Sequence, residues 1–183
     1  MQTKEKLWTY EDYLMIEDDK RYEVLEGELM MAPAPGTYHQ DISRNLEYLM
    51  WSYVKRKRLG VVYDAPIDVV FDEYNVLQPD IVYVCKERKK IIQERAIMGA
   101  PDLVVEIVSP STLSRDTVRK MKIYERFGVR EFWIVYPDMK CVEVLYLEGN
   151  SYRVVDEACL EGQKGSDSSM VIKGFKVNLK DIF

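Results

Sequence analysis

The sequence predicts an α/β fold, of the α+β kind with a mixed sheet, and three observations support this prediction. Residues 103–108 form a short apolar run that is rich in β-branched side chains. A helical pattern follows over residues 115–127 and stops at Gly128. Residues 131–136 form a second apolar run, closed by Pro137. A strand, a helix and a strand in this order predict a crossover unit whose two strands lie in one buried sheet.

Two smaller elements are expected near the start of the chain. Thr9 has the position of an N-cap for a short helix over residues 9–16. Residues 21–32 read as two strands that turn at Glu26-Gly27, which is a hairpin pattern. The other expected strands are 61–71, interrupted at Pro66, then 81–84, 141–147 and 152–156, with loops at 86–90 and 166–169.

A long amphipathic helix is expected from Thr37 onward. Thr37 and Gln40 have the spacing of a capping box, with Thr37 as the N-cap. The helix ends in the cationic run 55–58, and Gly60 is the expected C-cap. The four cations suit the negative end of a helix dipole, and a patch that contacts phosphates is the alternative interpretation. A second basic segment, 86–90, is expected to be a solvated loop.

Composition places the chain in the class of ordinary globular proteins. Its 183 residues favour one domain over 1–183, with 47% apolar and 31% charged residues. No apolar run has the length of a membrane span, so no membrane partner is expected. Three distant cysteines without a C-x-x-C pair predict neither a zinc site nor a disulfide, and a reduced cytoplasmic location is the default. The net charge of −5 argues against unspecific coating of nucleic acid.

Glu106 is the first candidate for a functional residue. It interrupts the apolar run 103–108, and a buried strand carries an acid only when that acid is paired or holds a metal. Glu106 also lies near the carboxyl end of its strand, which is where open α/β sheets bind ligands.

Lys120 is the second candidate, because of the face on which it lies. At 100° per residue, Asp116, Lys120 and Tyr124 share a face with Ile123, which is the face expected to pack on the sheet. Lys122 points almost the opposite way. Lys120 is therefore aimed at the strand that carries Glu106. The alternative is an exposed Asp116–Lys120 pair that only supports the helix.

Asp80 is the expected partner of Glu106 in a magnesium site. It follows Pro79 and opens the apolar run 81–84. Mg²⁺ needs few carboxylates and otherwise keeps its waters, so two acids suffice. Asp102 is the competing acid, but four residues along one strand separate it from Glu106 by roughly 13 Å, too far to share an ion.

His39, the only histidine, is expected to be a packed side chain near the site. A catalytic triad would need His39 together with a serine nucleophile such as Ser109 or Ser111. No G-x-S-x-G sequence is present, so the triad is not supported.

Several motifs together resemble the Uma family, within the PD-(D/E)xK nuclease superfamily. These motifs are the Gln-Pro-Asp triplet ending at Asp80, the run from Pro101 to Thr112 around Glu106, and the helix that carries Lys120 and leads into the strand 131–136. The segment around Glu23, the Pro-rich loop and the helix beginning near His39 are similar to that family as well. The resemblance covers residues 20–183.

The resemblance implies a restriction-endonuclease-like core with helices flanking a central mixed sheet, an N-terminal hairpin and added C-terminal strands. It implies Asp80 and Glu106 as metal ligands, with the carbonyl of Ile107 as a third, and Mg²⁺ or Mn²⁺ as the metal. Glu23 matches an N-terminal acid of the superfamily, although a solvated hairpin acid is the alternative. The superfamily lysine should follow Glu106 by two residues, where this chain has Val108, and the family pattern moves it to Lys120.

Three functions are consistent with these residues. The first is a Mg²⁺-dependent endonuclease that hydrolyses DNA phosphodiesters, with Asp80, Glu106, Lys120 and Glu23 as its catalytic set and with Tyr124 and Asp116 orienting Lys120. The second is a catalytically inactive nuclease fold that binds DNA or protein. The third is a structural protein in which Glu106 and Lys120 belong to a buried ion network. The resemblance also implies a homodimer, since many nucleases of this fold pair to address both strands.

Overall fold

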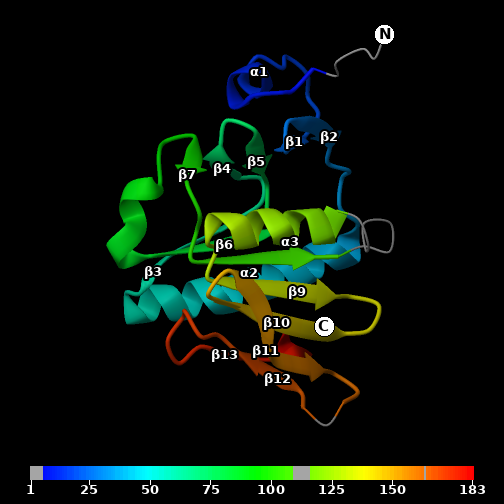
Figure 1. Cartoon of the computed structure of the whole chain (residues 1–183). Coiled ribbons are helices and arrows are strands. Elements are labelled where there is room, and N and C mark those ends of the chain that lie inside the picture. Colours follow the sequence, from blue (N-terminus) through cyan, green and yellow to red (C-terminus); the bar gives the residue numbers. More distant parts are fainter. Residues whose placement is uncertain (1–5, 109–115, 163) are drawn as a thin grey trace.

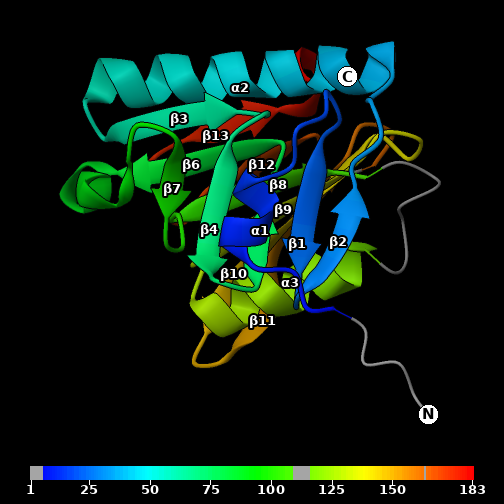
Figure 2. The same ribbon diagram turned by 90° about the horizontal axis from the view of Figure 1, so that it is seen from above.

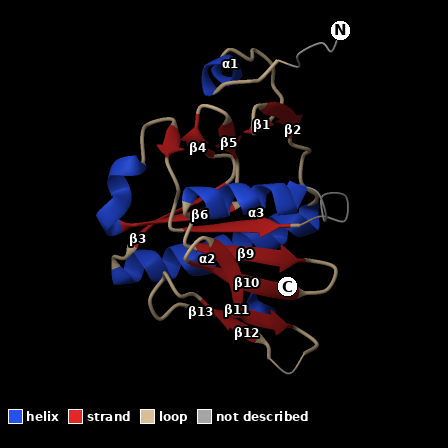
Figure 3. Ribbon diagram, viewed as in Figure 1, coloured by secondary structure: helices blue, strands red, loops and turns tan. Residues whose placement is uncertain are grey.

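The computed structural model describes residues 6–108, 116–162 and 164–183, and it has the mixed α+β architecture that the sequence predicts. Figure 1 shows two larger sheets with the helix α3 (Asp116–Phe127) between them, and Figure 3 separates helices from strands by colour. A third, two-stranded sheet near the C-terminus pairs β12 (Ser166–Ser168) with β13 (Lys176–Asn178).

The six-stranded sheet forms the centre of the molecule. Its strand order is β11-β10-β9-β8-β6-β3. The bounds of these strands are β3 Gly60–Asp64, β6 Ile81–Cys85, β8 Leu103–Ile107, β9 Glu131–Tyr136, β10 Cys141–Glu148 and β11 Ser151–Cys159. Within this sheet only β8 and β9 pair in parallel, and α3 connects them, which confirms the predicted crossover unit.

Alternate side chains of this sheet face two separate cores. Leu103 and Val105 of β8 pack with Leu46 and Met50 of α2 (Thr37–Lys57), together with the C-terminal segment that ends in η2 (Leu179–Asp181). Val104 faces the other way, into the core beneath α3. Figure 2 shows α2 along one side of the sheet and α3 on the opposite side. Because of this alternation, Glu106 shares the face of Val104 and points toward α3.

The five-stranded sheet covers α3 from outside. Its order is β2-β1-β5-β4-β7, and Leu25, Val69 and Ile97 enter the core that contains Ile123 of α3. The strands are β1 Tyr22–Leu25, β2 Glu28–Met31, β4 Asp68–Asp72, β5 Asn75–Leu77 and β7 Ala96–Met98. The predicted hairpin turn is confirmed, with left-handed φ values of 53° at Glu26 and 81° at Gly27. The short helix α1 (Tyr10–Leu14) has the expected Thr9 cap.

The ends of α2 differ from the expectation. Gly36 is the N-cap, and Thr37 is already helical, so no side chain caps this end. Arg58, in the left-handed conformation with φ 55°, is the C-cap. Gly60 instead begins β3, where a Cβ atom would lie 2.1 Å from the carbonyl oxygen of Val84. The glycine is needed for the close approach of two strands rather than for the helix end.

Two expected loops contain regular structure. Residues Lys86–Ile91 form the 3-10 helix η1, and Ser166–Ser168 form the strand β12. The basic run is helical because its chain must turn between β6 and β7, and short 3-10 turns are common connectors. No helix in the described ranges is long and apolar enough to cross a membrane.

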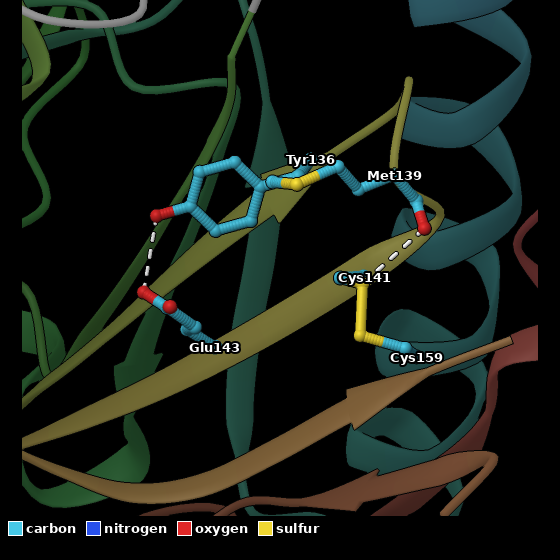
Figure 4. The surroundings of a disulfide bond; sticks show 5 residues. All are labelled: Tyr136, Met139, Cys141, Glu143 and Cys159. Atoms are coloured by element: carbon cyan, nitrogen blue, oxygen red, sulfur yellow. Dashed lines mark hydrogen bonds between the residues drawn. A yellow bond between two sulfur atoms is a disulfide. The ribbon is translucent and has the colours of Figure 1, made fainter. Parts of the chain in front are cut away.

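A disulfide joins Cys141 and Cys159, so the expectation of no disulfide was wrong. Figure 4 shows the bond between the neighbouring strands β10 and β11. The hairpin register places the two residues directly opposite each other, with their Cα atoms 4.1 Å apart. Their 18-residue separation along the chain hides this pairing, because only the hairpin brings the two ends together. Cys85 remains a free thiol.

Candidate active site

The strand register places Asp80 beside Glu106. β6 and β8 are antiparallel, and Ile81 lies opposite Val105, so the preceding Asp80 lies opposite Glu106. Residues opposite each other on neighbouring strands present their side chains to the same face. Asp80 Oδ2 also accepts a hydrogen bond of 2.7 Å from the backbone N–H of Ile107. Two carboxylates from distant segments therefore meet at one end of the sheet.

Lys120 enters this pair from α3. Its Nζ lies 3.2 Å from both carboxylate oxygens of Glu106. The side chain is 12% exposed, whereas Lys122 is exposed to solvent. The structure therefore places Lys120 inward, as the facing argument predicts, rather than in an exposed pair along the helix. The side chain of Asp116 is not among those that the structure describes, so its expected role in orienting Lys120 stays a prediction.

Glu23 reaches the same lysine from the five-stranded sheet. Its Oε1 lies 2.9 Å from Lys120 Nζ and accepts a hydrogen bond of 2.7 Å from the backbone N–H of Gln78. Glu23 is buried on β1, so it is not the solvated hairpin acid of the alternative interpretation. Packing of the hairpin across α3 brings it to the site.

Tyr124 occupies a different position from the one expected. It was expected to orient Lys120, but its hydroxyl donates a 2.5 Å hydrogen bond to Glu106 Oε1. One helical turn separates Tyr124 from Lys120, so both side chains reach the same carboxylate from α3. The buried tyrosine thus fixes Glu106 rather than the lysine.

His39 lies against Asp80, near the N-terminal end of α2. Its Nε2 is 3.3 Å from Asp80 Oδ2, as expected of a packed histidine near the site. Burial alone would lower the pKa of His39, but the hydrogen bond to Asp80 and the charge of Asp80 raise it. Its Nδ1 is buried and has no hydrogen-bond partner among the described residues.

These side chains line one open cavity of about 290 Å³. Its wall includes three carboxylates, Lys120 and His39, and the Pro-rich loop 33–36 forms one side. The carboxylates are Glu23, Asp80 and Glu106. A concave site with convergent charged groups, among them Glu106 and Lys120 with raised pKa values, is typical of an active site.

Comparison with known families identifies the chain's relatives. Residues 9–180 match the model of the Uma2 family, which is described as "Putative restriction endonuclease". The chain belongs to the Uma2 family. This confirms the resemblance that the motifs around Asp80, Glu106 and Lys120 predicted.

A solved structure shows the same fold. The chain is similar to a crystal structure described as "a putative nuclease belonging to DUF820" from Anabaena variabilis. The TM-score is 0.77 at 22% sequence identity, over 96% of this chain and 97% of that chain. No curated protein matches the chain. The predicted fold class is confirmed by this structural neighbour.

The charges of this Uma2 site are unbalanced. Burial raises the pKa of Glu106 to about 7, although Lys120 acts to lower it, and Asp80 and Glu23 raise it further. Burial alone would lower the pKa of Lys120, but Glu106 and Glu23 raise it. Lys120 thus shares one positive charge between Glu106 and Glu23, while Asp80 is paired with His39 and Arg21 also lines the cavity. The carboxylates would still attract a further cation to the cavity.

The donor atoms present fit Mg²⁺. Asp80, Glu106 and the carbonyl of Ile107 offer hard oxygen ligands, and Mg²⁺ is held by one or two carboxylates with waters in its other positions. The described residues contain no group of three or more His, Cys, Asp or Glu side chains that could hold a metal. A magnesium ion here would therefore rest on two carboxylates and the backbone.

Several contacts were not visible in the sequence. The N–H groups of Gln78 and Ile107 hold Glu23 and Asp80, respectively, and His39 closes the far side of Asp80. Backbone donors have no side-chain pattern, so no sequence signal identifies them. For His39, the sequence indicated only a packed side chain near the site.

Proposed function

We propose that this Uma2 protein is a Mg²⁺-dependent endonuclease that hydrolyses DNA phosphodiester bonds. Asp80, Glu106 and the carbonyl of Ile107 hold the ion, and Mn²⁺ can replace Mg²⁺. The observation that carries the proposal is the placement of Asp80 opposite Glu106 with Lys120 on the same carboxylate. The family membership supports hydrolysis of nucleic acid.

The chain's own residues supply positioning and charge. When bound, Mg²⁺ lowers the pKa of a ligand water and stabilises negative charge on the phosphate. Lys120 is placed to donate to a phosphate oxygen or to orient the attacking water. Glu23 holds Lys120, Tyr124 holds Glu106, and both contacts keep these side chains in one geometry before substrate enters.

Two other functions predict different behaviour. A structural role of the network treats Lys120, Glu106 and Glu23 as a buried ion cluster, and such clusters tolerate well-packed apolar replacement. Under this hypothesis, the joint replacement of Glu106→Met and Lys120→Met would leave the protein folded and its structural role unchanged. An inactive DNA-binding or protein-interaction module would bind without any metal-dependent cleavage.

The first experiment is calorimetry of Mg²⁺ and Mn²⁺ binding to the parent and to Asp80→Ala. Asp138→Ala is the matched control, because Asp138 is an exposed acid in the turn between β9 and β10. We expect one site that is lost only in Asp80→Ala. Plasmid nicking follows with the same three proteins. Equal cleavage by the parent and by Asp80→Ala would contradict the proposal.

A homodimer in the cytoplasm completes the proposed function. A duplex presents two strands, so two copies of the site allow both to be cut. Sedimentation equilibrium of the purified protein distinguishes a mass of 21.5 kDa from twice that value. A monomer at all concentrations, with plasmid nicked and never linearised, would show that one copy acts alone.

A further inference from the structure

The two basic segments of the chain meet at one end of the molecule. The first segment is the end of α2, residues 55–58, and the second is η1, residues 86–91. The backbone N–H of Lys86 donates a 2.9 Å hydrogen bond to the carbonyl of Leu59, which joins the segments. Figures 1 and 2 both show this end opposite the start of α3. We call residues 55–58 and 86–91 the basic end.

A groove runs between the segments of the basic end. It has a volume of about 430 Å³ and is lined by Lys55 and Arg58 from α2 and by Lys89 from η1. Trp51 forms part of its wall, and Lys55 Nζ lies 4.2 Å from the centre of the indole ring. The attraction between the cation and the ring restricts the Lys55 side chain, so less side-chain entropy is lost when this lysine binds an anion.

The cations of this groove are available to a ligand. Lys55, Arg58 and Lys89 are all exposed, and within the described parts of the chain no carboxylate lies at ion-pair distance from them. Arg88, by contrast, is engaged with the buried Asp102. The two segments contain eight cations and a single acid, Glu87, in a chain whose net charge is −5. Positive charge is therefore concentrated here against the overall balance.

A helix dipole explains only half of this arrangement. Cations in the last turn of α2 are stabilised by the unpaired carbonyls at its end. That effect does not account for a second basic segment packed against the first, because like charges at close range repel each other. A polyanion that neutralises both segments removes this repulsion, and nucleic acid is the polyanion that the proposed function provides.

We propose that the basic end binds the phosphate backbone of duplex DNA as an anchor separate from the hydrolytic cavity. This inference rests on the proposed function and adds a second contact to it. Sixteen residues of α2 separate His39 from Lys55, or about 24 Å at 1.5 Å per residue. For a duplex that lies along α2, at 3.4 Å per base pair, the anchor would contact DNA about seven base pairs from the phosphate in the cavity.

The test is a salt titration of binding, with a fluorescent duplex of 30 base pairs in EDTA so that no cleavage occurs. The anchor variant carries Lys55→Gln, Arg58→Asn and Lys89→Gln, with Asn chosen because it tolerates the left-handed conformation at the C-cap. The matched control carries Lys122→Gln, Lys176→Gln and Lys180→Gln, three exposed lysines elsewhere. Both variants lose the same net charge.

We expect the anchor variant alone to lose affinity by tenfold or more. The slope of log K against log salt should fall by about 0.9 for each phosphate contact removed, hence by about 2 to 3. Trp51 gives a local readout, because DNA should change the tryptophan emission of the parent but not that of Trp51→Phe. Circular dichroism checks folding, and Lys89→Gln alone serves if the triple variant unfolds, with a slope change of about 1.

The outcomes separate this inference from the proposed hydrolysis. Equal loss of affinity in the anchor variant and the control, or no DNA binding by the parent, overturns the anchor. If the parent cleaves DNA and the anchor variant binds DNA as well as the control does, the proposed hydrolysis stands and the anchor does not. Binding that depends on the anchor, with no cleavage under any metal, supports the anchor and contradicts the hydrolysis.

Discussion

The two ends of β8 each hold a buried acid, and the two acids have opposite surroundings. Asp102 precedes the strand and is fully buried, with hydrogen bonds from Cys85 N–H at 2.7 Å, Arg88 at 3.1 Å and Arg130 at 2.5 Å. Glu106, near the other end, shares a single lysine with Glu23. Two cations thus serve one carboxylate at the first end, and one lysine serves two carboxylates at the second.

The pKa values show the consequence. Burial alone would raise the pKa of Asp102, but the Cys85 N–H and Arg88 lower it. At Glu106 burial prevails and raises the pKa to about 7, despite Lys120. A balanced cluster stabilises the fold, whereas an unbalanced one at a cavity keeps a place for a ligand cation. The comparison therefore favours a structural role for Asp102 and supports the proposed metal site at Glu106.

The largest expected effect follows from Glu106→Gln. This change keeps the size of the side chain and removes the charge that would hold a metal. We expect cleavage to fall by at least about 100-fold, because charge stabilisation by the metal lowers the activation barrier by several kcal/mol. Plasmid nicking measures the loss, and urea unfolding should show little change in stability. Full activity in Glu106→Gln would place the chemistry elsewhere.

Asp102→Asn tests the other end. We expect a loss of about 3 kcal/mol in the free energy of unfolding at pH 7, since two arginines lose their charged partner. Metal binding should be unchanged. Because the folded state lowers the pKa of Asp102, its contribution is present above the unfolded value of 3.8 and disappears as the pH falls below it. Urea unfolding at several pH values should show the two proteins converging in acid.

A comparison of Lys120→Met with Arg130→Met sharpens the contrast in cation balance. Lys120→Met removes the cation that Glu106 and Glu23 share, whereas Arg130→Met leaves Arg88 on Asp102. We expect the first to cost about 2 kcal/mol more than the second, because Arg130 is half exposed and screened by water. Thermal unfolding with and without Mg²⁺ measures both. Added Mg²⁺ should stabilise both variants through the proposed site, but it should narrow the gap to the parent only in Lys120→Met.

The smallest effect is expected from Tyr124→Phe. The change removes one hydrogen bond to Glu106 and leaves the ring packing in place. We expect a cost of about 1 kcal/mol in stability and a rate reduced by about tenfold or less. Tyr152→Phe is the matched control, because its hydroxyl donates to the Val129 carbonyl away from the cavity. Similar rate losses in both variants would indicate a structural role for Tyr124.

Much of the central unit could be predicted from the sequence. The apolar runs on both sides of α3 and the stop at Gly128 determine strand, helix and strand, because periodicity and chain termination are local properties. The inward direction of Lys120 was also predictable, since the angular spacing of a helix is fixed. The separation of Asp102 from Glu106 followed from the rise per residue of a strand.

Contacts between distant segments were decided by the tertiary structure alone. The register of β6 against β8 brings Asp80 to Glu106, and the hairpin carries Glu23 across α3 to Lys120. The same is true of the Cys141–Cys159 pair and of the meeting of η1 with the end of α2. The physical reason is that local patterns fix which face of an element is apolar, whereas strand register and layer packing fix which polar groups meet across those faces.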